Sequence, residues 1–532
     1  MTCRQIGDSF SGWKGAAYLA ALFVFLCSSA WAQDDDIQLA LPDSDFAVSG
    51  RFLGFDGQFI RVETPAGEVT LAYDSLTCVG AACPDANFVP IVRFSGSQRI
   101  GQLIMPPLIE AYARDVGATV AIARRIDGVV TFQLHSVDSG KGLMQIVVRS
   151  TTSADGFADL VASEADIVMS AREVTAAELA LAREAGLGQL DRQGRSRIIA
   201  LDALVPVVSP ETGLAQISLE NVSRIFAGEV TNWADIGGSD AAIALHLLPD
   251  WLGQMQGFQA RVLAPAGRTV SPDVQRHATP EGLAAALMND PRGFGVLPFG
   301  ALGDTQPMRL VGSCGIGVAA RLMTLKTEDY PLTMPLFLYL PARRLHPEVD
   351  AFLGWLRRPS AQLVIRRAGF VDQTAIAIPV AQQGDRFAQA ITAAGAEVPL
   401  AELQRMVRIL GPQVRLSTTF RFEVGSTRLD AQSRSNVLQL ARDIRDGRHD
   451  GHVLMLVGFS DGRGPANANR DLSSARAQAV RRAVIAALEP GLPPQVSLET
   501  EAFGEALPMA CDDTLWGQQT NRRVELWVAD RR

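Results

Sequence analysis

The sequence predicts a multidomain α/β protein, and three features of the chain support this fold class. With 532 residues, of which 47% are apolar and 20% charged, the chain can form several domains with buried cores. The stretch from Phe46 to Tyr73 alternates apolar and polar residues as β-strands do. From about Val89 onward, apolar strand-like runs alternate with helical segments, the pattern of an α/β domain. We therefore expect a small β-rich domain followed by larger α/β domains.

The N-terminus has the pattern of a cleaved secretion signal. Arg4 and Lys14 precede an apolar run from Gly15 to Leu26, and Ala30-Trp31-Ala32 forms a small-x-small cleavage site. The apolar run is shorter than a bilayer span. Residues 1–32 are therefore predicted to be a signal peptide, and the remainder a secreted, soluble protein.

Composition and motif spacing argue against several classes of function. The formal net charge of −8 disfavours nucleic acid as the main partner. None of the six histidines has metal-ligand spacing to a cysteine or to another histidine. No Gly-x-Ser-x-Gly elbow follows an apolar strand. We therefore expect no nucleic-acid binding, no metal site, no cofactor and no enzyme activity.

Four cysteines remain once the signal peptide is removed, an even set that favours disulfides in an oxidising compartment. Cys78 and Cys83 flank a short flexible loop and are predicted to pair. Cys314 and Cys511 would then be free or joined across two domains, because pairing requires their Cα atoms to lie within about 7 Å.

Residues 33–88 are predicted to form a small β meander. Asp56-Gly57 lies between two strand-like runs and is a hairpin-turn signal. A second turn, Pro65 to Gly67, precedes a third strand from Val69 to Tyr73.

The next domain opens with a strand, a Gly/Ser loop and a helix. The strand is Ile91 to Phe94, the loop runs from Ser95 to Arg99, and the helix is expected over Ile100 to Val116. Unpaired N–H groups and the helix dipole at such a loop favour an anion. Most such loops are only helix caps, so further residues are needed to support a site.

Several stretches downstream together resemble the phosphate-binding (PstS-like) periplasmic substrate-binding proteins. The most specific is Phe226-Ala-Gly228-Glu-Val-Thr-Asn232-Trp233. The others are Glu164–Arg172, Ile199–Val208, Gly293–Pro298, Lys326–Leu332 and Gly369–Asp372. The resemblance implies a two-lobed, type II-like periplasmic binding protein fold over residues 89–375, with a ligand cleft between the lobes. It also implies two crossing strands, near 200–208 and near 308–311, and an ABC permease as a possible partner.

The resemblance places phosphate-binding groups in three loops, and this sequence keeps only part of them. The first loop has Gln98 and Arg99 where a small residue and Thr are usual, and the second has Ala171 where Ser or Asp is expected. In the third, the family's Arg falls on Leu248, and its Ser-Gly-Thr falls on Leu252-Gly253-Gln254. The candidate ligand-binding residues are Ser95, Gly96, Ser97, Gln98, Arg99, Ser170, Arg172, Gly253 and Gln254. Either Arg99 or Arg172 supplies the missing charge, or the ligand is not phosphate, or the lobes dock a protein.

Near the C-terminus, a predicted strand, loop and helix bring an acidic and a basic side chain to the same end of the sheet. Asp461 follows the apolar run His452 to Phe459, and Arg476 lies in the early turns of the next helix. A ligand with both an ammonium and a carboxylate would suit this pair, because the guanidinium binds a carboxylate bidentately. Diaminopimelate in a peptidoglycan stem peptide is such a ligand.

This stretch resembles the OmpA-like, peptidoglycan-associated domain over roughly residues 411–532. The matching pieces are Asp461, Gly464, Asn469, Leu472-Ser473, Arg476-Ala477 and Asn521-Arg522-Arg523-Val524-Glu525. The resemblance implies an OmpA-like α/β sandwich in which Asp461 and Arg476 hold the diaminopimelate. It places Asn469, Ser460 and Arg522 at the same site, although Phe459-Ser460 replaces the usual His-Thr. Residues 376–410, between the two domains, are predicted to be a short helical connector.

Two hypotheses of different classes follow. The first is a periplasmic solute-binding protein of the phosphate or small-anion class, held at the peptidoglycan and outer membrane by its C-terminal domain. The second is a structural protein whose lobes dock another envelope protein or bind a non-phosphate solute.

Overall fold

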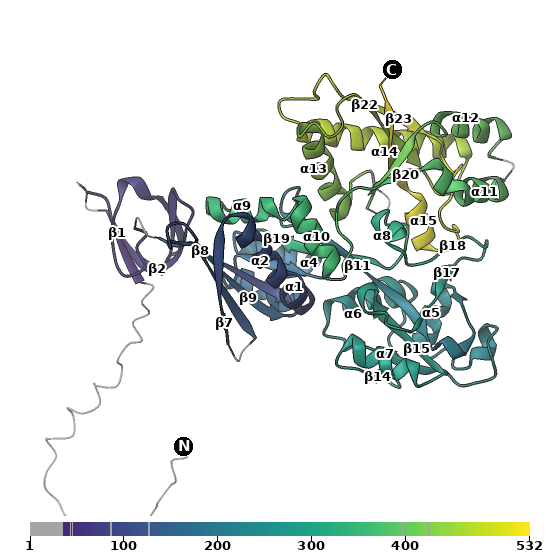
Figure 1. Cartoon of the computed structure of the whole chain (residues 1–532), viewed down its shortest axis with the longest axis horizontal. Helices are drawn as coiled ribbons and strands as arrows, with labels where there is room; N and C mark the ends of the chain where they lie inside the picture. Colours follow the sequence, from purple (N-terminus) through teal and green to yellow (C-terminus); the bar gives the residue numbers. More distant parts are fainter. Residues whose placement is uncertain are drawn as a thin grey trace, which may run out of the picture. The chain divides into compact units, whose positions relative to one another are not determined.

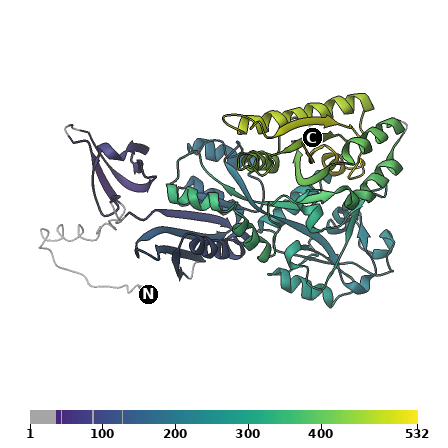
Figure 2. The same ribbon diagram turned by 45° about the horizontal axis from the view of Figure 1, so that its top comes forward.

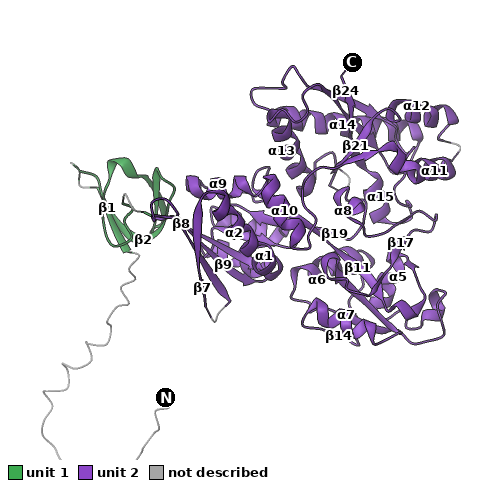
Figure 3. Ribbon diagram, viewed as in Figure 1, with its two compact units in different colours: residues 1–88 green, residues 89–532 purple. Residues whose placement is uncertain are grey.

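The structure is a computed structural model, shown from two directions in Figure 1 and Figure 2. It describes residues 36–531 except 43, 45, 86–87, 126–127, 396 and 424–425. The predicted signal peptide, residues 1–32, lies outside the described residues. The chain divides into two compact units, residues 1–88 and residues 89–532 (Figure 3). Across the described residues, no helix combines the length and the apolar character needed to span a membrane.

The first unit is an antiparallel five-stranded sheet in the order β4-β3-β2-β1-β5. Its strands are β1 (Asp36–Ala40), β2 (Ala47–Phe55), β3 (Phe59–Thr64), β4 (Gly67–Ala72) and β5 (Thr77–Val79). The predicted hairpin is present, because Asp56 Oδ1 accepts from the backbone N–H of Phe59 at 2.7 Å and Gly57 has φ +93°. A disulfide joins Cys78 to Cys83 and closes the loop after β5.

The second unit contains an eleven-stranded sheet in the order β14-β13-β15-β11-β19-β10-β6-β9-β8-β7, with β16 also paired to β11. This sheet covers both lobes. The strands of the first lobe are β6 (Ile91–Ser97), β7 (Ala118–Arg124), β8 (Val129–Ser136), β9 (Gly142–Thr151), β10 (Ile167–Ser170) and β19 (Thr333–Tyr339). Its helices are α1 (Gln98–Leu103), α2 (Met105–Asp115), α3 (Ser153–Val161), α4 (Ala176–Glu184), α9 (Pro347–Trp355) and α10 (Pro359–Arg367).

The second lobe is smaller. Its strands are β12 (Gln216–Ile217), β13 (Ala244–Leu247), β14 (Gln275–Arg276), β15 (Gly293–Pro298), β16 (Gln306–Pro307), β17 (Arg309–Val311) and β18 (Gly317–Val318). Its helices are α5 (Leu219–Phe226), α6 (Gly253–Phe258) and α7 (Pro280–Met288), followed by α8 (Leu322–Lys326). The Phe226, Phe258 and Phe294 rings pack together in its core, with Phe226 and Phe294 stacked at 5.0 Å.

The lobes are joined by β11 (Ser196–Val208), as the sequence predicted for the first crossing strand. Its first part pairs with β19 as far as Ala203, and its second part pairs with β15 from Leu204. The second crossing was predicted near 308–311, but β17 pairs with β12 of the second lobe. The chain instead returns to the first lobe at β19, because this strand pairs with β10 on one side and β11 on the other.

The C-terminal domain is a five-stranded sheet with helices on both faces. The sheet order is β20-β21-β24-β22-β23, from β20 (Ala377–Pro379), β21 (Val414–Arg421), β22 (His452–Phe459), β23 (Ser497–Ala502) and β24 (Arg523–Asp530). One face packs against α13 (Ala431–Arg445) and the long α14 (Ala466–Ala487), seen in yellow-green in Figure 2. The other packs against α11 (Gly384–Ala393) and α12 (Leu400–Leu410). The final helix is α15 (Leu515–Asn521).

The segment predicted as a connector thus forms helices that share a core with this sheet. Leu403, Met406 and Leu410 of α12 are buried in one cluster with Phe459 of β22 and Trp527 of β24. The 3.6-residue spacing that predicted an amphipathic helix therefore marks the face that packs on the sheet.

Candidate functional site

The Gly/Ser loop that opens α1 is built into the sheet. Gly96 has φ +130°, and a Cβ there would lie 2.1 Å from the Met169 carbonyl oxygen, so only glycine fits between β6 and β10. Ser95 donates its hydroxyl to Asp159 at 2.5 Å. These two candidate ligand residues therefore support the local fold, and the cleft is lined by the residues after them.

A small cavity of about 20 Å³ lies where the two lobes meet, enough for about one water molecule. The first lobe and the second lobe both contribute to its wall. The lining residues are Ser97, Gln98, Arg99, Thr151, Thr152, Ser153, Ala171, Trp251, Leu252, Gly253 and Gln254. A Cβ at Gly253 would lie 2.6 Å from the Ser153 hydroxyl, so the lobes are in close contact here.

Arg99 and Gln254 converge on a carboxylate that the sequence analysis did not single out. Arg99 Nε donates to Asp202 Oδ2 at 2.5 Å, and Gln254 Nε2 donates to the same oxygen at 2.9 Å. Asp202 lies on β11, is 1% exposed, and accepts from the Ala203 N–H through Oδ1 at 2.8 Å. A charged residue inside the apolar run 199–208 was the sequence signal for it, because buried carboxylates need partners.

Two further candidates of the cleft, Ser170 and Arg172, do not line this cavity. Arg172 donates to Glu178 at 2.7 Å and to Gln256 at 3.1 Å. Ser170 donates to the Arg172 carbonyl oxygen at 2.7 Å. The positive charge of the cleft therefore comes from Arg99, one of the two arginines that the sequence left open.

The second candidate site lies at the end of β22 and along the first half of α14. The helix begins at Ala466, so Arg476 lies near its middle and not in its early turns as predicted. Asp461 is buried and accepts from Arg522 Nη2 at 2.7 Å. Asn469 donates to Glu505 Oε2 at 2.5 Å. The Ser460 hydroxyl is buried and has no hydrogen-bond partner among the described residues. The five residues of this predicted site therefore include an Asp461–Arg522 ion pair at its edge.

Arg476 is the notable side chain of this second site. It is 4% exposed, and its Nε and Nη1 have no hydrogen-bond partner within the described part of the chain. Burial, and then the neighbouring Arg522, lower the pKa of this guanidinium, and Asp461 opposes that shift. Because an unpaired buried guanidinium is costly, the arrangement suits an incoming carboxylate that would bind both free N–H groups.

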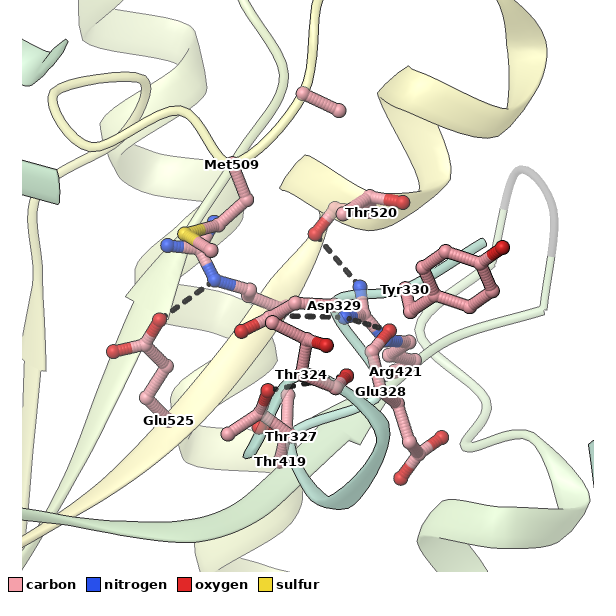
Figure 4. Close-up of polar contacts among 12 residues, drawn as sticks. Thr324, Thr327, Glu328, Asp329, Tyr330, Thr419, Arg421, Met509, Thr520 and Glu525 are labelled. Atoms are coloured by element: carbon pink, nitrogen blue, oxygen red, sulfur yellow. Dashed lines mark hydrogen bonds and ion pairs between the residues drawn. The ribbon is translucent and has the colours of Figure 1, made fainter. Parts of the chain in front are cut away.

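A buried ionic network, absent from the sequence analysis, joins the C-terminal sheet to the segment between α8 and β19 (Figure 4). Asp329 accepts from Arg421 at 3.2 Å and from Arg415 at 3.4 Å. Glu525 pairs with Arg386 at 2.6 Å, and two more arginines contact it. These charges lie far apart in sequence, so only the packing of the two domains brings them together.

An open hollow of about 710 Å³ lies beside this network, with walls from both lobes and the C-terminal domain. Carboxylates are frequent among its lining residues. Burial, with the nearby Asp430 carboxylate, raises the pKa of Glu328 to about 8. Glu173 lines the same hollow, where its side chain is still reached by solvent. Desolvation by the surrounding walls, together with the Asp430 carboxylate, raises the pKa of Glu173 as well. Among the described residues, no group of three His, Cys, Asp or Glu side chains could hold a metal ion.

A second disulfide, Cys314–Cys511, spans the same junction with a sequence separation of 197 residues. This resolves the alternative that the sequence left open for these cysteines. The bond lies beside a second tie, in which the Ser313 N–H donates to Asp513 at 3.1 Å.

Replacing Cys314 and Cys511 together by Ser is expected to lower the free energy of unfolding by about 2–4 kcal/mol, because the bond closes a long loop in the unfolded chain. Urea denaturation of the protein measures this. The matched control is the Cys78/Cys83→Ser pair, whose short loop of separation 5 should cost less and affect only the first unit. An equal loss of unfolding free energy in both double variants would contradict the assignment of Cys314–Cys511 as the disulfide that stabilises this junction.

Comparison with known proteins matches two segments of the chain to described families. Residues 91–359 match the PBP superfamily domain, and residues 421–522 match the OmpA family. Both resemblances seen in the sequence are thereby confirmed. The chain is 27% identical over 136 residues to the phosphate-binding protein PstS of Bacillus subtilis, which covers 25% of this chain and 43% of that protein.

One relative of the C-terminal domain is the peptidoglycan-associated lipoprotein of Pseudomonas putida. It is 36% identical over 115 residues, an alignment that covers 21% of this chain and 64% of that protein. The chain thus spans less than two thirds of the length of the curated relatives it matches. Among solved structures, an ABC-type phosphate transport receptor from Vibrio cholerae covers 53% of this chain and 99% of its own, with 17% identity and a TM-score of 0.41.

Proposed function

The chain belongs to the PBP superfamily and carries a C-terminal OmpA domain, and on this premise we propose that it is a solute-binding protein anchored to the cell wall. The proposal places it in the periplasm, bound to peptidoglycan and associated with the outer membrane. Its relatives are named as phosphate-binding and peptidoglycan-associated proteins, so no catalytic step is proposed.

The observation that carries the wall-binding half is the buried Arg476 with two unpaired N–H groups. A stem-peptide carboxylate supplies the acceptors that this guanidinium lacks. The diaminopimelate ammonium then goes to Asp461, which is held by Arg522 alone among the described side chains. Ser460 and Asn469 complete the proposed wall of the pocket.

The solute half of the proposal centres on Arg99. It is the one charged side chain among the described residues that line the cavity, so an anionic group of the solute would bind it. Ser97, Gln98, Gly253 and Gln254 are proposed to complete the contacts. Phosphate or a related small anion is the first class to test, and delivery to an ABC permease would follow if such binding is found. The lobes must part to admit any solute, with ligand shifting the open–closed equilibrium.

Calorimetry with the secreted full-length protein tests the solute half. The titrants are phosphate, sulfate and small carboxylates. We expect saturable binding of at least one of them with a Kd of about 1 μM, which corresponds to about 8 kcal/mol, and loss of that binding in Arg99→Gln. Arg114→Gln, which removes an exposed cation of the same lobe, is the matched control. If every titrant gives no heat with folded protein, binding of these small anions through Arg99 is refuted.

One observation favours the alternative function, docking of another envelope protein. The cleft has room for only about one water molecule, and Arg99 already forms an ion pair with Asp202. Failure of all titrants, together with an intact Arg99–Asp202 pair, would shift the assignment to that docking role.

A further inference from the structure

The C-terminal domain is bonded to the second lobe at the hairpin formed by β17 and β18. The Cys314–Cys511 disulfide joins the turn of this hairpin to the segment before α15. Beside it, the Ser313 N–H donates to Asp513 Oδ2 at 3.1 Å. The hairpin is held in the second lobe, because β17 also pairs with β12. A covalent bond therefore ties the C-terminal domain to this lobe.

The same domain is fixed to the first lobe where the chain leaves that lobe. Val371 forms a β-bridge with Leu201, on the part of β11 that pairs with β19. Shortly afterwards, the Ser417 N–H of β21 donates to the Ile376 carbonyl at 2.9 Å, and the Ile376 N–H donates to Ser417 Oγ at 3.0 Å. Helix α13 also packs against β11. The C-terminal domain thus has contacts on both sides of the lobe crossing.

A third set of contacts falls on the returning segment between α8 and β19. Asp329 lies in this segment, is 3% exposed, and pairs with Arg421 at 3.2 Å (Figure 4) and with Arg415 at 3.4 Å. Both arginines belong to β21. Asn436 of α13 donates to the Glu328 carboxylate at 3.4 Å. Movement of this segment away from the C-terminal domain would leave buried charges without partners, which is strongly unfavourable.

These ties restrict how the two lobes can part. Opening of a two-lobed protein rotates one lobe about the crossing segments. With the Cys314–Cys511 bond intact, the C-terminal domain must follow the second lobe, so opening would pull it away from Asp329 and β11. With the bond open, the second lobe can swing away while the Asp329 network stays whole.

Packing adds little to the bond at this junction. The open hollow of about 710 Å³ lies between α5 of the second lobe and α15, so these two surfaces are not packed together there. Non-covalent contacts break and re-form rapidly, whereas an uncatalysed disulfide rearranges only over minutes to hours. The disulfide is therefore the tie that determines whether the second lobe can move.

We propose that the C-terminal domain is a strap across the hinge, and that the Cys314–Cys511 disulfide controls opening of the cleft between the lobes. The intact bond holds the lobes in the closed arrangement, in which the cleft has room for about one water molecule. Reduction of the bond frees the second lobe. As a control of solute entry, this inference rests on the proposed solute-binding function.

The reductant is of the dithiol class. Cys314 is exposed, so a thiolate of the dithiol can attack its sulfur, and Cys511 leaves as a thiolate. The second thiol of the reductant then displaces Cys314 from the mixed disulfide. In total, two electrons and two protons pass to the protein, which gains two thiols, and the reductant becomes a disulfide.

The test measures the distance between the lobes in the full chain without any solute. Maleimide spin labels are attached to Glu110→Cys on α2 and Ala285→Cys on α7, two exposed helical positions in different lobes. Cys3 and Cys27 are replaced by Ser in every sample, so only the introduced thiols react. Double electron–electron resonance should give one narrow distance in the oxidised protein. Dithiothreitol, added after labelling, should produce a second population shifted by several ångströms.

Two variants identify the bond that is responsible. Cys314→Ser/Cys511→Ser should show the shifted population without reductant, and dithiothreitol should change it no further. Cys78→Ser/Cys83→Ser removes the bond of the first unit, so it should match the wild type before and after reduction. Thermal melts show whether each sample is folded, and the reduced wild type replaces the first variant if that variant does not fold.

The strap is refuted if folded, reduced wild type keeps the oxidised distance, or if the oxidised protein already shows both distances in the same proportion. The result is independent of the calorimetric one, because no solute is present. A reduction-dependent distance with no heat from any titrant would leave the strap and remove the proposed binding of those anions. Anion binding with an unmoved distance would remove the strap alone.

Discussion

Asp461→Asn and Arg476→Gln are each expected to abolish co-sedimentation of the protein with diaminopimelate-type peptidoglycan. Arg476 is buried with two N–H groups unpaired, so its guanidinium has no competing acceptor among the described residues. Loss of a buried, bidentate charge pair typically costs several kcal/mol, which is at least a hundredfold in affinity. The bound fraction in a pelleting assay should therefore drop to the level of a no-sacculus blank.

The matched control for this experiment is Arg463→Gln. Arg463 is an exposed cation on the same loop, so this variant loses the same charge without touching the pocket. It should pellet like the wild type. Sacculi that carry lysine in place of diaminopimelate provide a ligand-side control, since lysine lacks the second carboxylate. If Asp461→Asn and Arg476→Gln both pellet fully while folded, the assigned pocket does not bind the wall.

Glu525→Gln is expected to lower the free energy of unfolding of the second unit by about 3–5 kcal/mol. Glu525 is fully buried and pairs with Arg386 at 2.6 Å, Arg523 at 2.7 Å and Arg415 at 3.3 Å. Removal of its charge leaves three buried guanidinium groups with Asp329 as the remaining carboxylate of the network. The midpoint of guanidinium chloride denaturation measures the loss. The control is Glu499→Gln, which changes an exposed glutamate on β23 of the same sheet.

The pH dependence of this loss has a definite sign. Burial alone would raise the pKa of Glu525, but the three arginines hold it well below the usual value. Because the folded-state pKa is lowered, the stabilisation is complete above the unfolded-state pKa of about 4.3 and disappears as pH falls below it. The difference between wild type and Glu525→Gln should thus be constant from pH 7 to about pH 5 and shrink in more acidic buffer. A constant difference down to pH 2 would contradict the ionised assignment.

The sequence was sufficient for features that depend on neighbouring residues. The Asp56-Gly57 hairpin, the amphipathic segments of 376–410 and the Cys78–Cys83 bond all follow from short spacings along the chain. Both family resemblances also rest on short ordered motifs, and the comparisons confirm them. The placement of Asp461 at a strand end needed only the apolar run before it and the breakers after it.

The tertiary structure alone decided which charges meet. Arg99 and Asp202 are 103 residues apart, Asp202 and Gln254 are 52 apart, and Cys314 and Cys511 are 197 apart. Arg172, an equal candidate with Arg99 in the sequence, is paired with Glu178 and does not line the cavity. Local pattern determines which element a residue belongs to. The partner of a buried charge, however, depends on how distant elements pack, because its desolvation can be offset only by groups that packing brings within a few ångströms.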